Sequence, residues 1–342
     1  MEKILTVAVP SYNAAEYLKK NIPALASLPD AKALDVILVD DGSTDDTGAV
    51  ADDFARRYPE TVRVIHKENG GHGSGVNAGL DAALGEYYCV LDADDSIRPE
   101  GFTELLYALS SVSGRGKGAP DLVLCDFDFT DEEGKAFRHV ALERLPKGKV
   151  FSFEEMAGQI HSGPDRWVWI HNAFYRTQVL RGMGFRCHEH HYYVDMEYIL
   201  YPLREVRLAA YFPLTARNYL VGRQGQSVSV ESRVRHFDQY LDVVRFLTEE
   251  YREKWSGEPE QIRAYYCRRT AEYITGVYST LFAFPDRKKA RAQALAFDRE
   301  LKKESPEIYR ANENAAVRLL RLSHFAIFGM GAWVYGRYGG RH

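Results

Sequence analysis

The stretch Val90-Leu91-Asp92-Ala93-Asp94-Asp95 puts three carboxylates at the end of the apolar run 87–91. A run of this length is typical of a buried β-strand. Similar short apolar runs occur at 4–9, 36–39, 62–65 and 122–124. Stretches with helical spacing lie between them, at 15–28, 45–58 and 76–84. This alternation predicts an α/β fold with a mostly parallel sheet flanked by helices, in which ligands bind at the carboxyl ends of the strands.

The charge balance gives no sign of a nucleic-acid partner. The 342 residues carry 44 lysines and arginines against 48 aspartates and glutamates, which is a formal net charge of -4. Nucleic-acid-binding domains are usually basic. With 45% hydrophobic and 27% charged residues, the composition is that of an ordinary globular protein. An anionic ligand must therefore be held by local groups.

The cysteines and the first residues indicate the cytoplasm. Cys89, Cys125, Cys187 and Cys267 lie far apart and form no CxxC pair, so neither a disulfide framework nor a zinc ribbon is indicated. The apolar run that ends at Val9 meets a proline and polar residues too soon to be the core of a signal peptide. We expect a reducing compartment.

The pattern changes along the chain. Regular alternation ends near residue 126, and helix and strand signals mix from 153 to about 230. We therefore predict a domain over 1–230, with a ligand-binding half (1–126) and a second half (127–230). The rest, 231–342, is predicted to be a helical extension, with helices at 232–254, 258–282, 286–303 and 313–335.

Polar motifs follow the first two predicted strands. Pro10-Ser11-Tyr12-Asn13 joins a rigid proline to an aromatic ring that can support a flat base, although a turn with a packed tyrosine explains it equally well. In Asp40-Asp41-Gly42-Ser43-Thr44-Asp45, carboxylates at a strand end can accept hydrogen bonds from a base or a ribose hydroxyl. We assign Asp45 to capping the next helix.

A glycine-rich turn, Asn69-Gly70-Gly71 through Asn77-Ala78-Gly79, leads into the third helix. Glycines allow backbone N–H groups to approach a phosphate or sugar closely, and a helix amino end favours an anion. The turn has Val76 where the dinucleotide pattern needs glycine, and it lacks the Gly-Lys-Ser/Thr of a P-loop. A dehydrogenase or a P-loop nucleoside triphosphatase is not expected.

The acids at 92, 94 and 95 repel one another when they are desolvated, so a cation should lie among them. Carboxylate oxygens together with a diphosphate suit Mg²⁺ or Mn²⁺. The alternative is a solvated acidic turn, which the buried strand before it disfavours.

In this order and spacing, the four motifs resemble the family 2 glycosyltransferases, which have the Rossmann-like GT-A fold. The resemblance implies that a nucleotide is bound by Pro10, Tyr12, Asp40, Asp41, Asn69, Gly70, Asn77 and Asp92. It also implies that Asp92 contacts the ribose and that Asp94 holds Mn²⁺ or Mg²⁺ on the diphosphate.

The resemblance makes 1–126 the nucleotide-binding half and 127–230 the acceptor half, and it continues less sharply over 165–230. Family members carry an acidic catalytic base in a Glu-Asp pair, and Tyr193-Val194-Asp195-Met196-Glu197 lies in the corresponding place. Asp195 is our choice, with Glu197 second, because two residues apart on a helix they cannot face the same pocket. An acceptor or diphosphate loop would use His190, His191, Glu197, Arg223, Gln226 and Ser227. A zinc site at 188–191 is disfavoured by its tight spacing, and no Gln-x-x-Arg-Trp motif of processive synthases is present, which favours transfer of one sugar per encounter.

The carboxyl-terminal residues suggest a membrane surface. No acid follows Glu313, and Arg318, Arg321, Arg337 and Arg341 flank the apolar run 322–336. That run is shorter than the ~20 residues needed to span a bilayer. A helix over 316–337 that lies among lipid headgroups is one interpretation. A terminal helix packed on the protein is the other.

Taken with the resemblance, these features predict a metal-dependent inverting glycosyltransferase. It would transfer a sugar from a nucleotide sugar, with UDP-sugar favoured, to the hydroxyl of a glycan or lipid-linked acceptor. The pathway would be synthesis of a cell-surface polysaccharide or teichoic-acid-like glycan, in the cytoplasm at the inner face of the membrane. The alternatives are a sugar nucleotidyltransferase and a non-catalytic sugar-binding protein. The acids at 92, 94 and 195 argue against the second of these.

Overall fold

A computed structural model describes residues 2–160, 165–223, 226–227, 229–255 and 257–338. The chain divides into two compact units, Met1–Arg223 and Gln224–His342. The sequence predicted a division near residue 230. How activities are shared between the two parts stays a prediction.

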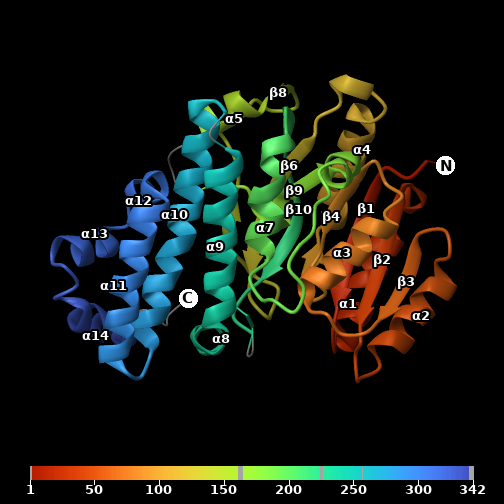
Figure 1. Ribbon diagram of the computed structural model, residues 1–342. Coiled ribbons are helices and arrows are strands. Elements are labelled where there is room, and N and C mark those ends of the chain that lie inside the picture. Colours follow the sequence, from red (N-terminus) through yellow and green to blue (C-terminus); the bar gives the residue numbers. More distant parts are fainter. Residues whose placement is uncertain (1, 161–164, 224–225, 228, 256, 339–342) are drawn as a thin grey trace. The chain divides into compact units, whose positions relative to one another are not determined.

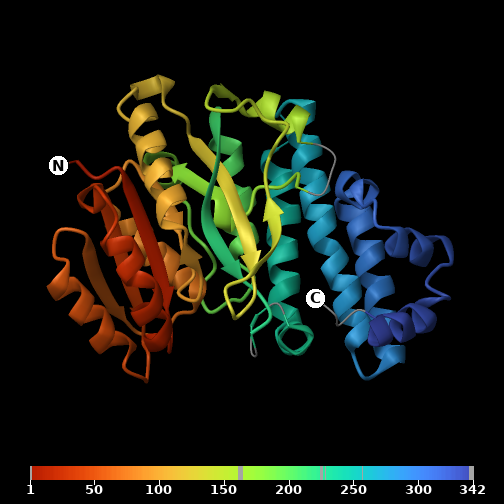
Figure 2. The same cartoon turned by 180° about the vertical axis from the view of Figure 1, so that it is seen from behind.

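The described part of the first unit is built on a ten-stranded sheet (Figures 1 and 2). The order is β3-β2-β1-β4-β9-β6-β10-β5, with β7 paired to β6 and β8 to β10. Neighbouring strands within β3-β2-β1-β4 are parallel, as are β6 and β10, whereas β5, β7, β8 and β9 pair antiparallel. This confirms the mostly parallel sheet. The strands are β1 Leu5–Ser11, β2 Leu34–Asp41, β3 Val62–Lys67, β4 Tyr87–Val90, β5 Ser96–Ile97, β6 Leu122–Thr130, β7 Ala136–Val140, β8 Val150–Ser152, β9 Ala173–Arg176 and β10 Leu208–Leu220.

Helices cover this sheet because its central strands are apolar on both sides. In β1, Leu5, Val7 and Val9 join the core cluster that includes α1 and α4, whereas the alternate residues Ala8 and Pro10 face α3. The helices of the unit are α1 Ala15–Ala26, α2 Thr47–Arg57, α3 His72–Ala82, α4 Pro99–Val112, α5 Phe153–Gln159, α6 Thr177–Gly182 and α7 Asp195–Leu200. Short 3₁₀ helices lie at η1 Ala31–Ala33, η2 Gly116–Gly118, η3 Ile170–Asn172 and η4 Tyr201–Glu205.

The described part of the second unit is helical, which confirms the predicted extension. Its longest helix, α10, packs against α8, α9, α11, α12 and α14. Ile274, Val277 and Leu281 of α10 are almost fully buried and form part of its core. The helices are α8 Val230–Arg235, α9 Phe237–Lys254, α10 Glu260–Ala283, α11 Arg287–Glu304, α12 Pro306–Ala311, α13 Ala315–Leu322 and α14 Phe328–Tyr338.

The single helix predicted over 316–337 is wrong, because the structure forms two helices, α13 and α14, with turns between them. His324 and Phe325 adopt left-handed backbone angles, with φ of 49° and 61°, which a continuous helix excludes. The break allows Phe325 and Phe328 both to be buried at 1% exposure. Among the described residues, no helix has the length and apolar character needed to cross a bilayer.

Candidate active site

The carboxyl ends of β1, β2, β3 and β4 bring the sequence motifs together. The register aligns Ser11 of β1 with Asp40 of β2, and Asp41 with Lys67 of β3. The acids 92–95 follow β4, which pairs with the other side of β1. The four motifs therefore lie along one edge of the sheet, where an α/β fold binds its ligands.

The turns after β1 and β2 are tied to each other. The Asn13 backbone N–H donates to Ser43 Oγ at 3.1 Å, and the Thr44 N–H donates to Asn13 Oδ1 at 2.8 Å. Tyr12 is 54% exposed, so its ring is available to a ligand. The prediction that Asp45 caps α2 is wrong by one position, because Asp46 lies at the N-cap and its side chain makes no capping bond. Asp45 instead accepts the N–H of Thr47, the first residue of α2, at 2.9 Å.

Asp40 is held as a carboxylate at this edge. Its Oδ1 accepts the Ser43 N–H at 3.0 Å, and its Oδ2 lies 3.0 Å from Nδ1 of His66, whose Nε2 lies 3.0 Å from Asp52. Burial disfavours the charged form, but the bonds from Ser43 and His66 outweigh it and lower the pKa of Asp40. Asp40 can therefore accept a hydrogen bond from a ligand at neutral pH.

Asp41 has a different environment and shapes the glycine-rich turn. Its carboxylate accepts the N–H groups of Gly70 at 2.9 Å and Gly71 at 2.7 Å, and it lies 2.7 Å from Nζ of Lys67. The Asn69 side chain donates to the Asp41 carbonyl at 2.9 Å. Asp41 is only 3% exposed. These bonds favour a supporting role, and direct contacts of Asp41, Asn69 and Gly70 with a nucleotide stay predictions.

Close packing puts α3 directly over β1. A Cβ at Gly75 would lie 2.8 Å from Cβ of Pro10, and a Cβ at Gly79 would lie 2.5 Å from that of Ala8. At Gly73 it would lie 2.2 Å from the carbonyl oxygen of His188. The helix begins at His72, four residues before the predicted start at 76, and Gly71 precedes it with φ of 81°.

Each acid after β4 has a nitrogen partner. Asp92 Oδ1 lies 2.9 Å from Nε2 of His72, Asp94 Oδ2 lies 2.6 Å from Nε of Arg223, and Asp95 Oδ2 lies 3.1 Å from Nδ1 of His171. The prediction that something cationic lies among these acids is thus met by His72 and Arg223, and His171 supplies a third nitrogen partner. His72 lies within the glycine-rich turn, but the sequence predicted no role for it, and His171 was not predicted at all.

These pairings shift the pKa values. Burial disfavours protonated His72, but the hydrogen bond with Asp92 and the charges of Asp92, Asp195 and Asp94 raise the pKa of His72 to about 9. Burial likewise disfavours the carboxylate of Asp92, but His72 outweighs this effect and lowers the pKa of Asp92 to about 2. Burial raises the pKa of Asp95 to about 6, with His171 opposing it. Asp92 and His72 are thus an ion pair at neutral pH.

The residues fit a divalent cation. Asp92, Asp95 and His171 can each offer one ligand atom, and these atoms lie within 4.8 Å of one another. Two carboxylates and an imidazole suit Mn²⁺, and carboxylates alone suit Mg²⁺. Asp94, the predicted ligand, would first have to exchange Arg223 for the ion.

The two acids of α7 differ sharply. Glu197 is fully buried, and its carboxylate accepts the His188 N–H at 2.9 Å and lies 2.7 Å from Nδ1 of His188. The Asp195 side chain is 49% exposed, and its Oδ1 lies 3.9 Å from Nδ1 of His72. The partial burial of Asp195 and the charge of Asp92 raise the pKa of its carboxyl group, while His72 opposes this rise. Because His72 also contacts Asp92, Asp195 borders the acid cluster.

The loop before α7 is fixed to the glycine-rich turn. Asn77, 5% exposed, donates to the carbonyl of Cys187 at 2.9 Å and accepts the Cys187 N–H at 2.9 Å. The His190 N–H donates to the Gly70 carbonyl at 2.5 Å, and His191 Nδ1 lies 2.9 Å from the Glu189 carbonyl. These bonds give Asn77 a role in holding the loop, and its contact with a nucleotide stays a prediction.

The predicted downstream loop spans the division between the units. Arg223 contacts Asp94, and its guanidinium lies 5.4 Å from the ring of Tyr17. Gln226 and Ser227 belong to the second unit, so their part in the site stays a prediction.

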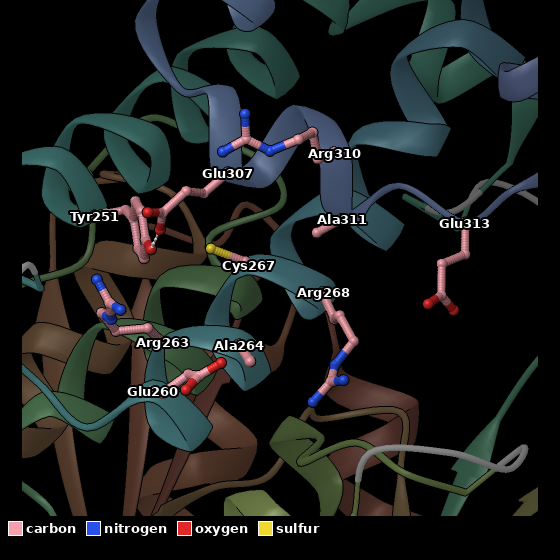
Figure 3. Close-up of a pocket in the computed structure, with 10 residues that line it drawn as sticks. All are labelled: Tyr251, Glu260, Arg263, Ala264, Cys267, Arg268, Glu307, Arg310, Ala311 and Glu313. Atoms are coloured by element: carbon pink, nitrogen blue, oxygen red, sulfur yellow. Dashed lines mark hydrogen bonds between the residues drawn. The ribbon is translucent and has the colours of Figure 1, made fainter.

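A polar pocket of about 420 Å³ lies in the second unit, between α9, α10 and α12 (Figure 3). The hydroxyl of Tyr251 donates to Glu307. Burial raises the pKa of Cys267 to about 12, so this thiol is not a nucleophile at neutral pH. As many acids as bases line the pocket, and no ligand charge is favoured. Its charged lining consists of Glu260, Glu307, Glu313, Arg263, Arg268 and Arg310.

Solved structures resemble the whole chain. The S. aureus TarS 1–349 crystal structure in complex with UDP-GlcNAc has a TM-score of 0.65 and 17% identity, and the match covers 99% of this chain and 93% of that one. The mannosyltransferase PcManGT from Pyrobaculum calidifontis, in complex with GDP-Man and Mn²⁺, has a TM-score of 0.51 and 16% identity, over 100% and 89% of the two chains. At such identities the likeness concerns the fold, which is GT-A.

Sequence comparison covers the first half of the chain. The model described as Glycosyl transferase family 2 matches residues 6–180. Glycosyltransferase GlyG of Streptococcus pneumoniae serotype 4 is 32% identical over 174 residues, 51% of this chain and 54% of GlyG. The uncharacterized glycosyltransferase EpsJ of Bacillus subtilis is 30% identical over 183 residues, 52% of this chain and 49% of EpsJ. The chain spans about half the length of these curated relatives. Because the family match covers half of the chain and includes the motifs at all four strand ends, this protein belongs to glycosyl transferase family 2.

Proposed function

We propose that this glycosyltransferase is inverting and metal-dependent, and that it transfers a sugar from a UDP-sugar to an acceptor hydroxyl. The observation that carries the proposal is the chain of contacts Asp92–His72–Asp195, with distances of 2.9 and 3.9 Å. It joins the acids expected to meet the nucleotide to an accessible carboxylate. The TarS structure holds UDP-GlcNAc, which supports UDP as the nucleotide.

In this proposal the nucleoside meets the edge formed by Pro10, Tyr12 and Asp40. The exposed ring of Tyr12 stacks on the base, and the ionised Asp40 accepts a hydrogen bond from it. Asp92 accepts a hydrogen bond from the ribose. Asp41, Asn69, Gly70 and Asn77 hold the turn and the loop around the bound nucleotide.

A divalent ion, Mn²⁺ or Mg²⁺, would be held by Asp94 with help from the nearby donors of Asp92, Asp95 and His171. It would neutralise charge on the departing diphosphate. Arg223, if released from Asp94, would offer its guanidinium to the diphosphate, and Gln226 and Ser227 would contribute further polar groups. PcManGT was crystallised with Mn²⁺, which supports this assignment.

Asp195 is the proposed general base. Its raised pKa makes it a stronger base than an ordinary aspartate, and its exposed carboxylate can reach an acceptor hydroxyl. Removal of that proton as the hydroxyl attacks the anomeric carbon gives a single displacement with inversion. Glu197 is occupied by His188 and supports the loop that carries His190 and His191, which would border the acceptor.

We further propose that the acceptor is a glycan or a lipid-linked glycan of the cell-surface polysaccharide or teichoic-acid class, and that transfer occurs at the inner face of the membrane. The family resemblance supports this class of acceptor. The exposed apolar side chains and arginines of α13 and α14 support contact with a membrane.

The deciding experiment is release of UDP from a panel of UDP-sugars, with Mn²⁺ or with a chelator, in the presence of glycan acceptors. We expect release with at least one UDP-sugar, dependent on the metal and lost in Asp195→Asn. Release from GDP-sugars alone would contradict the choice of UDP, and equal release with the chelator would contradict the role of the metal.

A further inference from the structure

The second unit contains an apolar groove of about 400 Å³ between α10, α13 and α14. Phe282 of α10 lies on one side, Ala316 and Leu319 of α13 on another, and Met330 and Val334 of α14 on a third. Tyr335 contributes the one polar side-chain group of this lining, and Arg233 already donates to its hydroxyl at 3.1 Å. The volume lies within the range of small-molecule sites, about 300–1,000 Å³.

The surface around this groove is apolar to an unusual degree. Among the described residues, ten large apolar or aromatic side chains are exposed, and five of them lie on α13 or α14. An exposed apolar patch of this kind commonly marks a binding surface. The five are Leu319, Leu322, Met330, Trp333 and Val334, with exposures from 44% to 78%.

Several arginines contact lining residues of the groove or lie on the helices that form it. Arg287 donates to the carbonyl of Phe282, a lining residue, and Arg291 donates to the carbonyl of Phe325 at 2.7 Å. The guanidinium of Arg337 lies 5.4 Å from the ring of Trp333, and Arg318 is exposed on α13. Nearby Asp298 is paired with Arg321 at 2.8 Å. The surroundings of the groove are therefore rich in arginine, while its lining is apolar.

We propose that this groove binds one hydrocarbon chain of an anionic phospholipid while its arginines contact the lipid phosphates. The inference deepens the membrane contact proposed above and rests on it. The apolar groove matches the hydrocarbon chain of an anionic lipid, and the arginines near it match the lipid phosphate. A second copy of the chain is a poorer occupant, because two copies joined through this face would bring these arginines together.

The test distinguishes a groove that binds one hydrocarbon chain from a surface that binds apolar molecules nonspecifically. In Ala316→Trp, an exposed lining residue becomes a large side chain that fills the groove while adding apolar surface. The matched control is Leu322→Ser, which removes a 78% exposed apolar side chain outside the lining. A third variant, Leu319→Glu, puts a negative charge into the lining. All three sites are exposed, and thermal unfolding will verify that the variants fold.

Two probes are measured with the full chain. Monomeric dodecyl phosphate reports on the groove by calorimetry, and flotation with phosphatidylglycerol or phosphatidylcholine vesicles reports on the membrane. Because each buried methylene group contributes several-fold to affinity, we expect Ala316→Trp to bind dodecyl phosphate at least about tenfold more weakly. Leu319→Glu should behave similarly, and Leu322→Ser should bind normally. The unaltered chain should float with phosphatidylglycerol vesicles and much less with phosphatidylcholine.

Several results would contradict the proposal that the groove binds a lipid chain. Normal binding of dodecyl phosphate by Ala316→Trp would do so while leaving the membrane contact standing. Failure of the unaltered chain to float with phosphatidylglycerol would remove both. Self-association that Ala316→Trp abolishes would identify a second copy as the occupant. UDP release with a soluble acceptor is measured on the same samples, so a failed glycosyltransferase assignment is seen independently.

Discussion

The carboxylates after β4 are paired with nitrogen atoms of other segments, whereas the carboxylate in the first turn of α7 is not closely paired. Asp92, Asp94 and Asp95 each lie within 3.1 Å of a nitrogen from another segment. Asp195 has its nearest cation, His72, at 3.9 Å, and it is half exposed. In the proposed function, the first region would have to exchange partners before it binds a metal and a nucleotide, whereas Asp195 could meet a substrate directly. The difference supports the proposal that the first region binds the donor and that Asp195 transfers the proton.

The largest expected effect follows from Asp195→Asn, which keeps size and polarity but cannot take a proton. We expect the transfer rate to fall by about 10²–10⁴-fold, with UDP-sugar affinity near normal, because a base acts only as the new bond forms. Single-turnover transfer and equilibrium binding measured side by side provide the check. A normal transfer rate in Asp195→Asn would contradict the proposed role of Asp195 as the base.

Asp94→Ala should show the reverse pattern. We expect Mn²⁺-dependent affinity for UDP to fall by at least about 10–100-fold, since even residues behind a metal ligand contribute that much. Stability should change little, because Asp94 lies after a strand end and its partner Arg223 is partly exposed. Titration of UDP with and without Mn²⁺ measures the effect, and Asp53→Ala, on the surface of α2, is the matched control. Unchanged metal-dependent affinity would remove Asp94 as the ligand.

Glu197→Gln sharpens the comparison within α7 itself. Glu197 is fully buried and accepts two contacts from His188, so the neutral amide should cost about 1–3 kcal/mol in the free energy of unfolding. Transfer per folded molecule should fall far less than in Asp195→Asn. Urea unfolding and rate measurements on the same preparation test this. If Glu197→Gln is inactive and Asp195→Asn is not, the roles of the two acids are reversed.

The smallest effect concerns pH. Burial and Asp92 raise the pKa of Asp195, so its working, deprotonated form is lost as the pH falls through a value above that of an ordinary aspartate. His72 opposes that rise. His72→Gln should therefore move the acidic limb of the transfer rate to higher pH, by a fraction of a unit to about one unit. A limb that stays in place would show that His72 does not act on Asp195.

The sequence predicted the sheet and its edge well, because apolar runs and polar strand ends are local signals. It could not predict the partners of the predicted residues. Asp95 meets His171 and Asn77 meets Cys187, both far away along the chain, so these contacts depend on how the elements pack. His72 lies in the glycine-rich turn, but its contact with Asp92 depends on the close packing of α3 against β1.

The carboxyl-terminal region teaches the same lesson. The apolar run and its arginines were evident, and helices do form there. The turns after Leu322 were not predicted, because no glycine marks them and a bulky residue such as Phe325 rarely adopts a left-handed backbone. The interpretation as helices packed on the protein holds in part, since Val317, Leu320, Phe328 and Ala332 are buried, whereas the membrane interpretation stays a prediction.

The bonds from Asn77 and His190 have a consequence for how such enzymes diversify. They join the glycine-rich turn to the loop 187–191, which the proposed function puts on the donor and the acceptor side, so the two segments are structurally coupled. A mutation that reshapes the loop for a new acceptor would disturb the turn as well and would usually be lost. New acceptor preferences should therefore arise from changes outside this pair of segments, and protein engineers who graft acceptor loops between relatives should transplant both together.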